Sequence, residues 1–82
     1  MAKQLIGKIT HYFPKVGVAV VELKKGMKKG DMIEIEGHGR SFQQEVKSMQ
    51  IDKEDIEKAK AGDDIGLKVD EEVKENDQVY KV

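Results

Sequence analysis

Two histidines and two short acidic runs are the side chains best suited to acid–base or metal chemistry. His11 and His38 are the only histidines, and they lie far apart in sequence. A zinc site needs three or four ligands, and the chain has no cysteine to supply them. A His/carboxylate pair is possible, but no nucleophile signature accompanies it. We therefore expect His11 to be a packed or rim residue and His38, between two glycines, to be a plain turn residue.

The acidic runs have ordinary structural interpretations. Asp63-Asp64 follows Gly62 at the predicted start of a strand, where turn chemistry and strand-edge solvation are favoured over cation binding. Asp70-Glu71-Glu72 is expected to be a solvated loop. We thus predict no catalytic residue, no metal and no cofactor, and a protein that is not an enzyme.

Lysines form the one concentrated basic loop, and Arg40 lies in a separate turn. The candidate RNA-binding residues are Lys24, Lys25, Lys28, Lys29 and Arg40. Lysine binds phosphate without reading sequence, although four exposed lysines can also simply keep a loop soluble. Tyr12 and Phe13 near Lys15 offer a possible base-stacking surface. The favoured alternative places Phe13 in the core and Tyr12 at its rim.

Charge is distributed unevenly over the 82 residues. Residues 1–41 have eight Lys/Arg and four Asp/Glu, whereas residues 42–82 have seven and twelve. A generic nucleic-acid binder shows a basic footprint over the whole domain, so tight unspecific RNA binding is not expected.

Other function classes have no sequence support. The chain lacks a Gly-x-x-x-x-Gly-Lys-Ser/Thr phosphate loop, so we expect no GTP site. The longest nearly apolar run, 16–21, is far short of the roughly 20 residues of a membrane helix, and no signal peptide is recognisable. The absence of cysteine fits a cytoplasmic protein. The length predicts a single domain over residues 1–82.

Short alternating apolar runs separated by turn signals predict an all-β fold. The predicted strands cover 4–13, 16–23, 32–36, 41–51, 65–69 and 79–82, and the predicted interior residues are Ile9, Val21, Ile35, Val46, Leu67 and Val79. The apolar alternation changes phase near Lys47-Ser48, which indicates a bulge or bend. Residues 52–61 have helical propensity with Gly62 as a stop signal, and Asn76 is a candidate for positive φ.

Five motifs in order resemble the β-barrel domain that follows the GTPase domain in elongation factor Tu and its relatives. They are Ile6-Gly7-Lys8-Ile9, Gly26-Met27-Lys28-Lys29-Gly30-Asp31, Val46-Lys47-Ser48-Met49-Gln50, Ala59 to Leu67, and Val73 to Val79. The resemblance implies a small six- to seven-stranded antiparallel β-barrel of the translation-protein domain II type. It also implies a short strand at 56–58 instead of a helix.

The resemblance further implies a function and a pocket. It suggests a non-enzymatic binding module that contacts ribosomal RNA, tRNA or a protein of the translation machinery. The pocket positions for an aminoacylated tRNA end correspond to Ser48 and Asp64, and both depart from the family pattern. Similar barrels occur at the C-terminus of collagenase-like peptidases. The alternative is therefore a protein-interaction accessory domain or subunit of a larger enzyme.

Overall fold

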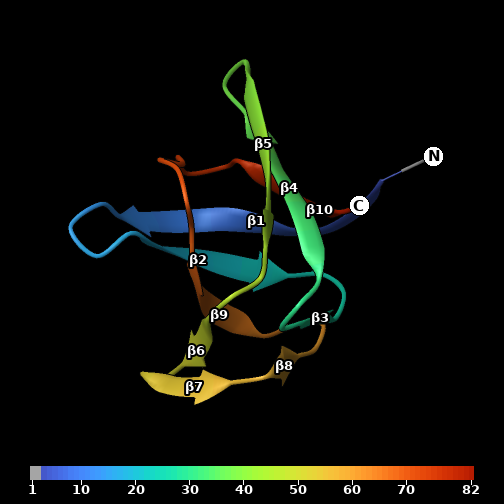
Figure 1. The fold of residues 1–82 in the computed structure, drawn as a ribbon, viewed down its shortest axis with the longest axis vertical. Coiled ribbons are helices and arrows are strands. Elements are labelled where there is room, and N and C mark those ends of the chain that lie inside the picture. The colour runs from blue at the N-terminus through green and yellow to red at the C-terminus, as the bar shows by residue number, and fades with distance from the viewer. Residues whose placement is uncertain (1–2) are drawn as a thin grey trace.

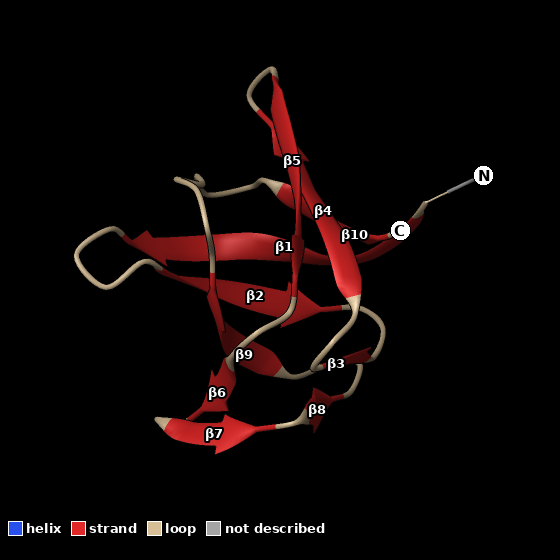
Figure 2. Ribbon diagram, viewed as in Figure 1, coloured by secondary structure: helices blue, strands red, loops and turns tan. Residues whose placement is uncertain are grey.

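The chain is built from short antiparallel strands, and the computed structural model describes residues 3–82. Within this range there are ten strands and no helix (Figure 2). The strands are β1 Gln4–Phe13, β2 Val18–Leu23, β3 Met27–Lys28, β4 Met32–Gly37, β5 Arg40–Glu45, β6 Met49–Ile51, β7 Glu54–Ile56, β8 Lys58–Ala59, β9 Asp64–Lys68 and β10 Gln78–Lys81. Residues 3–82 therefore contain no helix long and apolar enough to cross a membrane.

Eight of these strands form one sheet, in the order β5-β4-β10-β1-β2-β9-β6-β7, and β3 pairs separately with β8. The β1–β2 hairpin projects to the left in Figure 1, the β4–β5 hairpin to the top, and β7 and β8 lie at the bottom. The predicted all-β antiparallel fold is confirmed. The predicted closed barrel of six or seven strands is not, because among residues 3–82 no ladder joins the edge strands β5 and β7.

The core consists of side chains that alternate along the strands. All six predicted interior residues are 2% exposed or less: Ile9, Val21, Ile35, Val46, Leu67 and Val79. Five of them lie in strands and belong to the inward face of the strand, and Val46 lies just after the end of β5. Further buried residues that complete the same cluster include Ile6, Leu23, Ile33, Met49 and Ile65.

A bulge in β1 reverses the predicted facing of its second half. The register against β2 shifts between Ile9 and His11, and one extra residue in a strand moves the following side chains to the other face. Tyr12 therefore packs against the core, whereas Phe13 is 46% exposed. The prediction of a core Phe13 was therefore wrong, whereas the rim position expected for Tyr12 is confirmed by its partial burial. Of the two positions expected for His11, packed or rim, the packed one is excluded, because its side chain is 53% exposed.

The predicted bend near Lys47-Ser48 is confirmed as a break between two strands. β5 ends at Glu45 and β6 begins at Met49, while Val46 and Met49 both remain buried. Three residues outside the ladders thus let the chain change direction without losing its contact with the core.

Strand pairing overrides helical propensity in residues 52–61. Asp52 and Lys53 have positive φ and form the turn between β6 and β7, and β8 follows directly. Ile56 lies opposite Met49, and Ala59 lies opposite Met27. These contacts bury part of the few apolar side chains that the segment has, which an exposed helix would not do. The strand interpretation is confirmed, although its bounds differ from 56–58.

One turn occurs three times, at 28–31, 60–63 and 74–77, and each copy precedes a strand. In each, the aspartate Oδ2 accepts a hydrogen bond from the backbone N–H of the lysine three residues earlier, at 3.1, 3.1 and 2.9 Å. The third residue has positive φ, as a type II turn requires: Gly30 at 94°, Gly62 at 93° and Asn76 at 74°. The positive φ predicted for Asn76 is confirmed.

A buried glutamine joins β5 to the segment that follows β9. Gln44 is 4% exposed, and its Nε2 donates to the Lys68 carbonyl at 2.9 Å. Its Oε1 accepts from the Asp70 N–H at 2.8 Å. The side-chain amide thus donates one hydrogen bond and accepts another between β5 and residues 68–70, as a backbone peptide group does between paired strands.

Candidate functional site

The predicted basic loop is exposed and held by its backbone. Lys24 and Lys25 follow β2, and their N–H groups both donate to the Ile6 carbonyl, at 2.7 and 3.2 Å. The Lys29 N–H donates to the Glu57 carbonyl at 2.8 Å. Because the backbone is anchored, the lysine side chains project from a fixed support.

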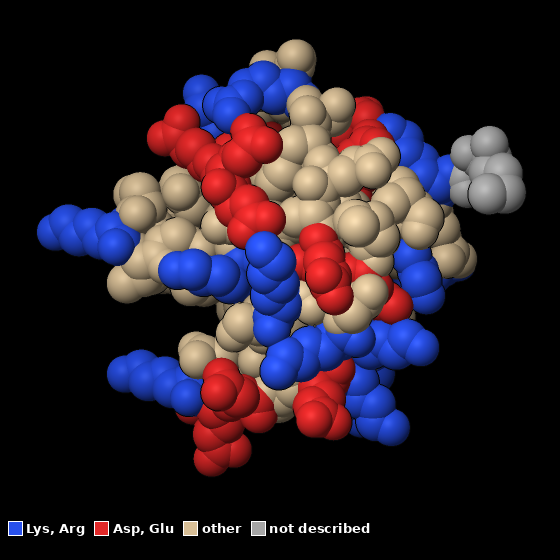
Figure 3. All heavy atoms as spheres, in the orientation of Figure 1, with Lys and Arg blue, Asp and Glu red and all other residues tan. Residues whose placement is uncertain are grey.

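Two further lysines, which sequence reasoning missed, join this loop. Pairing of β3 with β8 places Lys28 opposite Lys58, and Lys60 follows β8. We call the resulting group the lysine ribbon: Lys24, Lys25, Lys28, Lys29, Lys58 and Lys60, all exposed. Figure 3 shows basic side chains gathered at the lower right, where Figure 1 places β3. The local pattern gives no signal for this group, since 30 positions separate the paired strands.

Arg40 does not belong to the lysine ribbon. It begins β5 at the top of Figure 1, far from β3. Its guanidinium lies 3.9 Å from both Glu71 and Glu72, with all three side chains more than half exposed. The five predicted cations therefore lie at two separate places, and Arg40 faces Glu71 and Glu72.

His38 forms a close pair with a buried carboxylate. Its Nδ1 lies 2.7 Å from Oδ1 of Asp77, whose side chain is 9% exposed. The other carboxylate oxygen accepts from the Lys74 N–H in the 74–77 turn. A small cleft beside the pair is lined by Ile35, His38, Arg40, Phe42, Glu72, Lys74 and Asp77. His38 is in a turn as predicted, but its side chain is engaged rather than free.

His11 faces the same segment from β1. Its Nδ1 lies 3.5 Å from Glu75 Oε2, and its ring packs at a tilt on Phe13 with 4.5 Å between centroids. His11 thus contacts Glu75 and His38 contacts Asp77, and these two carboxylates flank Asn76 in the sequence. This arrangement holds a loop in place, and it brings no hydroxyl or thiol nucleophile into a hydrogen bond with either imidazole in residues 3–82.

The remaining acidic candidates are also structural. Asp63 belongs to the 60–63 turn, and exposed Asp64 lies opposite Glu22 of β2. Within residues 3–82, no group of three potential ligands is arranged to hold a metal ion.

Ser48 and Asp64 do not form a pocket. The Ser48 carbonyl accepts from Lys68 N–H at the end of β9, whereas Asp64 begins β9. Four residues of extended chain separate these points by roughly 13 Å. The pocket implied by the elongation-factor resemblance is therefore absent from the described chain.

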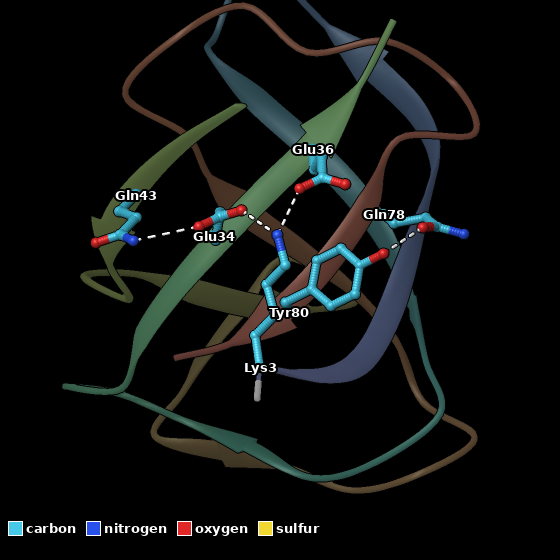
Figure 4. A network of polar contacts seen from close by, with 6 residues as sticks. All are labelled: Lys3, Glu34, Glu36, Gln43, Gln78 and Tyr80. Atoms are coloured by element: carbon cyan, nitrogen blue, oxygen red, sulfur yellow. Dashed lines mark hydrogen bonds and ion pairs between the residues drawn. The ribbon is translucent and has the colours of Figure 1, made fainter. Parts of the chain in front are cut away.

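The most extensive polar network lies on β4 and β10 (Figure 4). Lys3 Nζ contacts Glu34 at 2.6 Å and Glu36 at 2.5 Å, and it lies 4.7 Å from the Tyr80 ring centroid. The hydrogen bond from Lys3, and then that from Gln43, lowers the pKa of Glu34. The bonds to Glu34 and Glu36 raise the pKa of Lys3. The network links Lys3, which immediately precedes β1, to β4 and β10.

The Glu34 shift predicts a loss of stability in acid. Since the folded-state pKa lies below the unfolded value of about 4.3, the stabilisation is present above that value and is lost as pH falls through the folded pKa. We expect Glu34→Gln to flatten the acid limb of stability against pH in urea unfolding. Lys3→Met should flatten it similarly, and the double variant should add nothing further. If the stability of Glu34→Gln fell in acid as steeply as that of the parent, this assignment would be contradicted.

Comparison with known families decides the assignment. The model of the peptidase family U32 C-terminal domain matches residues 2–79. The chain belongs to this family. An uncharacterized protease of Methanocaldococcus jannaschii is 43% identical over 76 residues, which are 92% of this chain and 19% of that protein. A collagenase of Porphyromonas gingivalis is 33% identical over 81 residues, 96% of this chain and 22% of that protein.

The chain thus spans about a fifth of the length of these curated relatives. Solved structures agree on the fold. Two crystal structures of the C-terminal domain of a Geobacillus thermoleovorans protein named a U32 peptidase give TM-scores of 0.89 and 0.90 at 20% identity. They cover 95% and 96% of this chain, and 99% and 92% of theirs.

These findings correct the expected role in translation. The family is that of the U32 C-terminal domain and not that of elongation factor Tu, so the expected partners, ribosomal RNA, tRNA and translation proteins, have no support. The motifs that suggested elongation factors are largely turns before strands, and three of them contain the repeated aspartate turn. Such turns report on a small β fold more than on a function.

Proposed function

We propose that the chain is a non-enzymatic polypeptide-binding domain that serves a peptidase of the U32 family. The observation that carries this proposal is the extent of the family match. The family model matches nearly all of this chain. The same chain spans only about a fifth of the proteins named a protease and a collagenase. A part of this size is well suited to holding protein next to a catalytic part. We also propose a cytoplasmic location, in keeping with the absence of cysteine.

The surface supports binding more than catalysis. The Asp77 carboxylate accepts a hydrogen bond from the Lys74 N–H within the 74–77 turn. Its contact with His38 therefore serves to hold this turn against the β4–β5 hairpin. Phe13 and Val16 are 46% and 56% exposed at the β1–β2 hairpin, and exposed apolar side chains of this kind suit protein contacts.

We further propose that the sheet works as a barrel in which side chains and short contacts replace the missing ladder. Gln44 links β5 to the end of β9, and Val46 exchanges backbone hydrogen bonds with Gly30 and Asp31. Such links supply a stiff support for surface side chains.

The test combines binding and hydrolysis. The purified chain is immobilised and exposed to gelatin and to unfolded casein, and hydrolysis is followed with fluorescent forms of both. We expect reversible binding to at least one polypeptide and no cleavage above the buffer control. Cleavage that persists in the purified chain, or failure to bind either polypeptide, would refute the proposal.

A further inference from the structure

The lysine ribbon carries a charge arrangement that folding alone does not favour. Lys28 and Lys58 lie directly opposite each other, and like charges in opposed positions destabilise a strand pair. Among the described ion pairs of residues 3–82, none includes a lysine of the ribbon. The ribbon shares this property with other exposed lysines such as Lys15, but only in the ribbon do two lysines without a carboxylate partner lie opposite each other in a described strand pair. Departures from local rules of this kind are expected where a surface receives a ligand.

The ribbon also borders two hollows in the surface. One is lined by Gly26, Met27, Lys28, Asp31, Lys58, Ala59 and Lys81, and the other by Lys28, Lys29, Glu57 and Lys58. Lys28 and Lys58 are common to both, so the hollows flank the β3–β8 pair. Residues on one side of an extended peptide recur at about 7 Å, and alternate carboxylates could therefore meet several of these lysines in succession.

We propose that the lysine ribbon binds an acidic segment of a polypeptide. This inference rests on the proposed function, since it names the class of polypeptide and the surface that holds it. Charge complementarity favours a segment rich in Asp or Glu, because the ribbon offers six exposed lysines and its backbone is fixed by the bonds to Ile6 and Glu57. Such contacts weaken as salt is added.

A short peptide fits this surface better than a nucleic acid does. Glu57 lines one of the hollows together with Lys28, Lys29 and Lys58, and the exposed Glu54 and Asp55 of β7 precede it in the chain. A nucleic acid carries its negative charge continuously and would pass these carboxylates, whereas a peptide can end before them. The family assignment also joins this chain to proteins named for action on polypeptides.

Fluorescence anisotropy with a labelled peptide of alternating Glu and Ser tests the inference. Lys28→Glu and Lys58→Glu should each weaken binding about tenfold, as the loss of a close charge pair implies. Lys15→Glu in the β1–β2 turn makes the same charge change away from the ribbon and should alter binding less than twofold, as screening of distant charges implies. Lys28→Glu should also raise the urea midpoint, because it converts the Lys28–Lys58 pair into an opposite-charge pair.

Each alternative result has a definite meaning. No binding of the Glu/Ser peptide, an equal loss in Lys15→Glu, or tighter binding of an RNA oligonucleotide of equal net charge would overturn the inference. If the parent and the ribbon variants bind gelatin or casein equally well, the proposed function stands and only the ribbon is refuted. If the parent binds no polypeptide at all, the proposed function fails as well.

Discussion

Replacing Gln44 by glutamate is expected to lower the free energy of unfolding by about 2–4 kcal/mol, because a buried amide that makes two hydrogen bonds is replaced by a buried charge that can keep only one of them. The parent amide donates to the Lys68 carbonyl and accepts from the Asp70 N–H. A carboxylate can only accept, so one of its oxygens would face the Lys68 carbonyl oxygen in a buried position. For a domain of this size, with roughly 5–10 kcal/mol in total, that loss is large. Urea unfolding at neutral pH measures it.

Two further variants separate the possible causes. Gln43→Glu is the matched control, since Gln43 is exposed. It loses the hydrogen bond from Gln43 to Glu34 and sets a carboxylate beside Glu34, but solvent screening should limit the cost to roughly 1 kcal/mol. Gln44→Met keeps the volume but loses both bonds, which isolates the hydrogen bonds from the new charge. In acid, the new carboxyl of Gln44→Glu gains a proton that it can donate, so its deficit should shrink. Equal costs for Gln43→Glu and Gln44→Glu would show that the Gln44 link contributes nothing special.

Gln44 also shows where sequence reasoning stopped. Period-two alternation identified the interior residues because each apolar run reports the facing of its own strand. Gln44 is polar in a strand of mixed composition, and its partners lie 24 and 26 positions away. No local pattern indicates that a side-chain amide will replace a ladder. The same applies to the lysine ribbon, because Lys58, which lies opposite Lys28, belongs to a segment with helical propensity.

The errors at Phe13 and in the family assignment have related physical origins. A single inserted residue between Ile9 and His11 reversed the faces of β1, and the alternation of the apolar residues did not reveal it. Three of the motifs that resembled elongation factors contain the same aspartate turn before a strand. Their chemistry, a carboxylate bound to a backbone N–H with positive φ before a strand, serves any small β domain that needs tight corners. The proposed function therefore depends on the family match and not on these turns.

Gly37 occupies a position where any side chain would collide with Asp77. A Cβ added at Gly37 would lie 2.9 Å from Asp77 Cγ and 3.1 Å from its Cα, and nearer still to Oδ1. Asp77 cannot easily yield, because its carboxylate binds both His38 and the Lys74 N–H and its backbone N–H bonds the Lys74 carbonyl. The absence of a side chain at Gly37 therefore allows the β4–β5 hairpin to approach the 74–77 turn this closely.

Gly37→Ala is accordingly expected to cost about 3 kcal/mol, the sum of overpacking and weakened bonds to a buried carboxylate. Gly39→Ala is the control, since its added Cβ would meet nothing within 4 Å and only its φ of 75° is unfavourable, at about 1–2 kcal/mol. A double-mutant cycle with Asp77→Ala identifies the cause. If the carboxylate is the obstacle, Gly37→Ala should cost much less in that background, with a coupling of roughly 1.5–3 kcal/mol. Costs that simply add would place the strain in the β4–β5 backbone and not between Gly37 and Asp77.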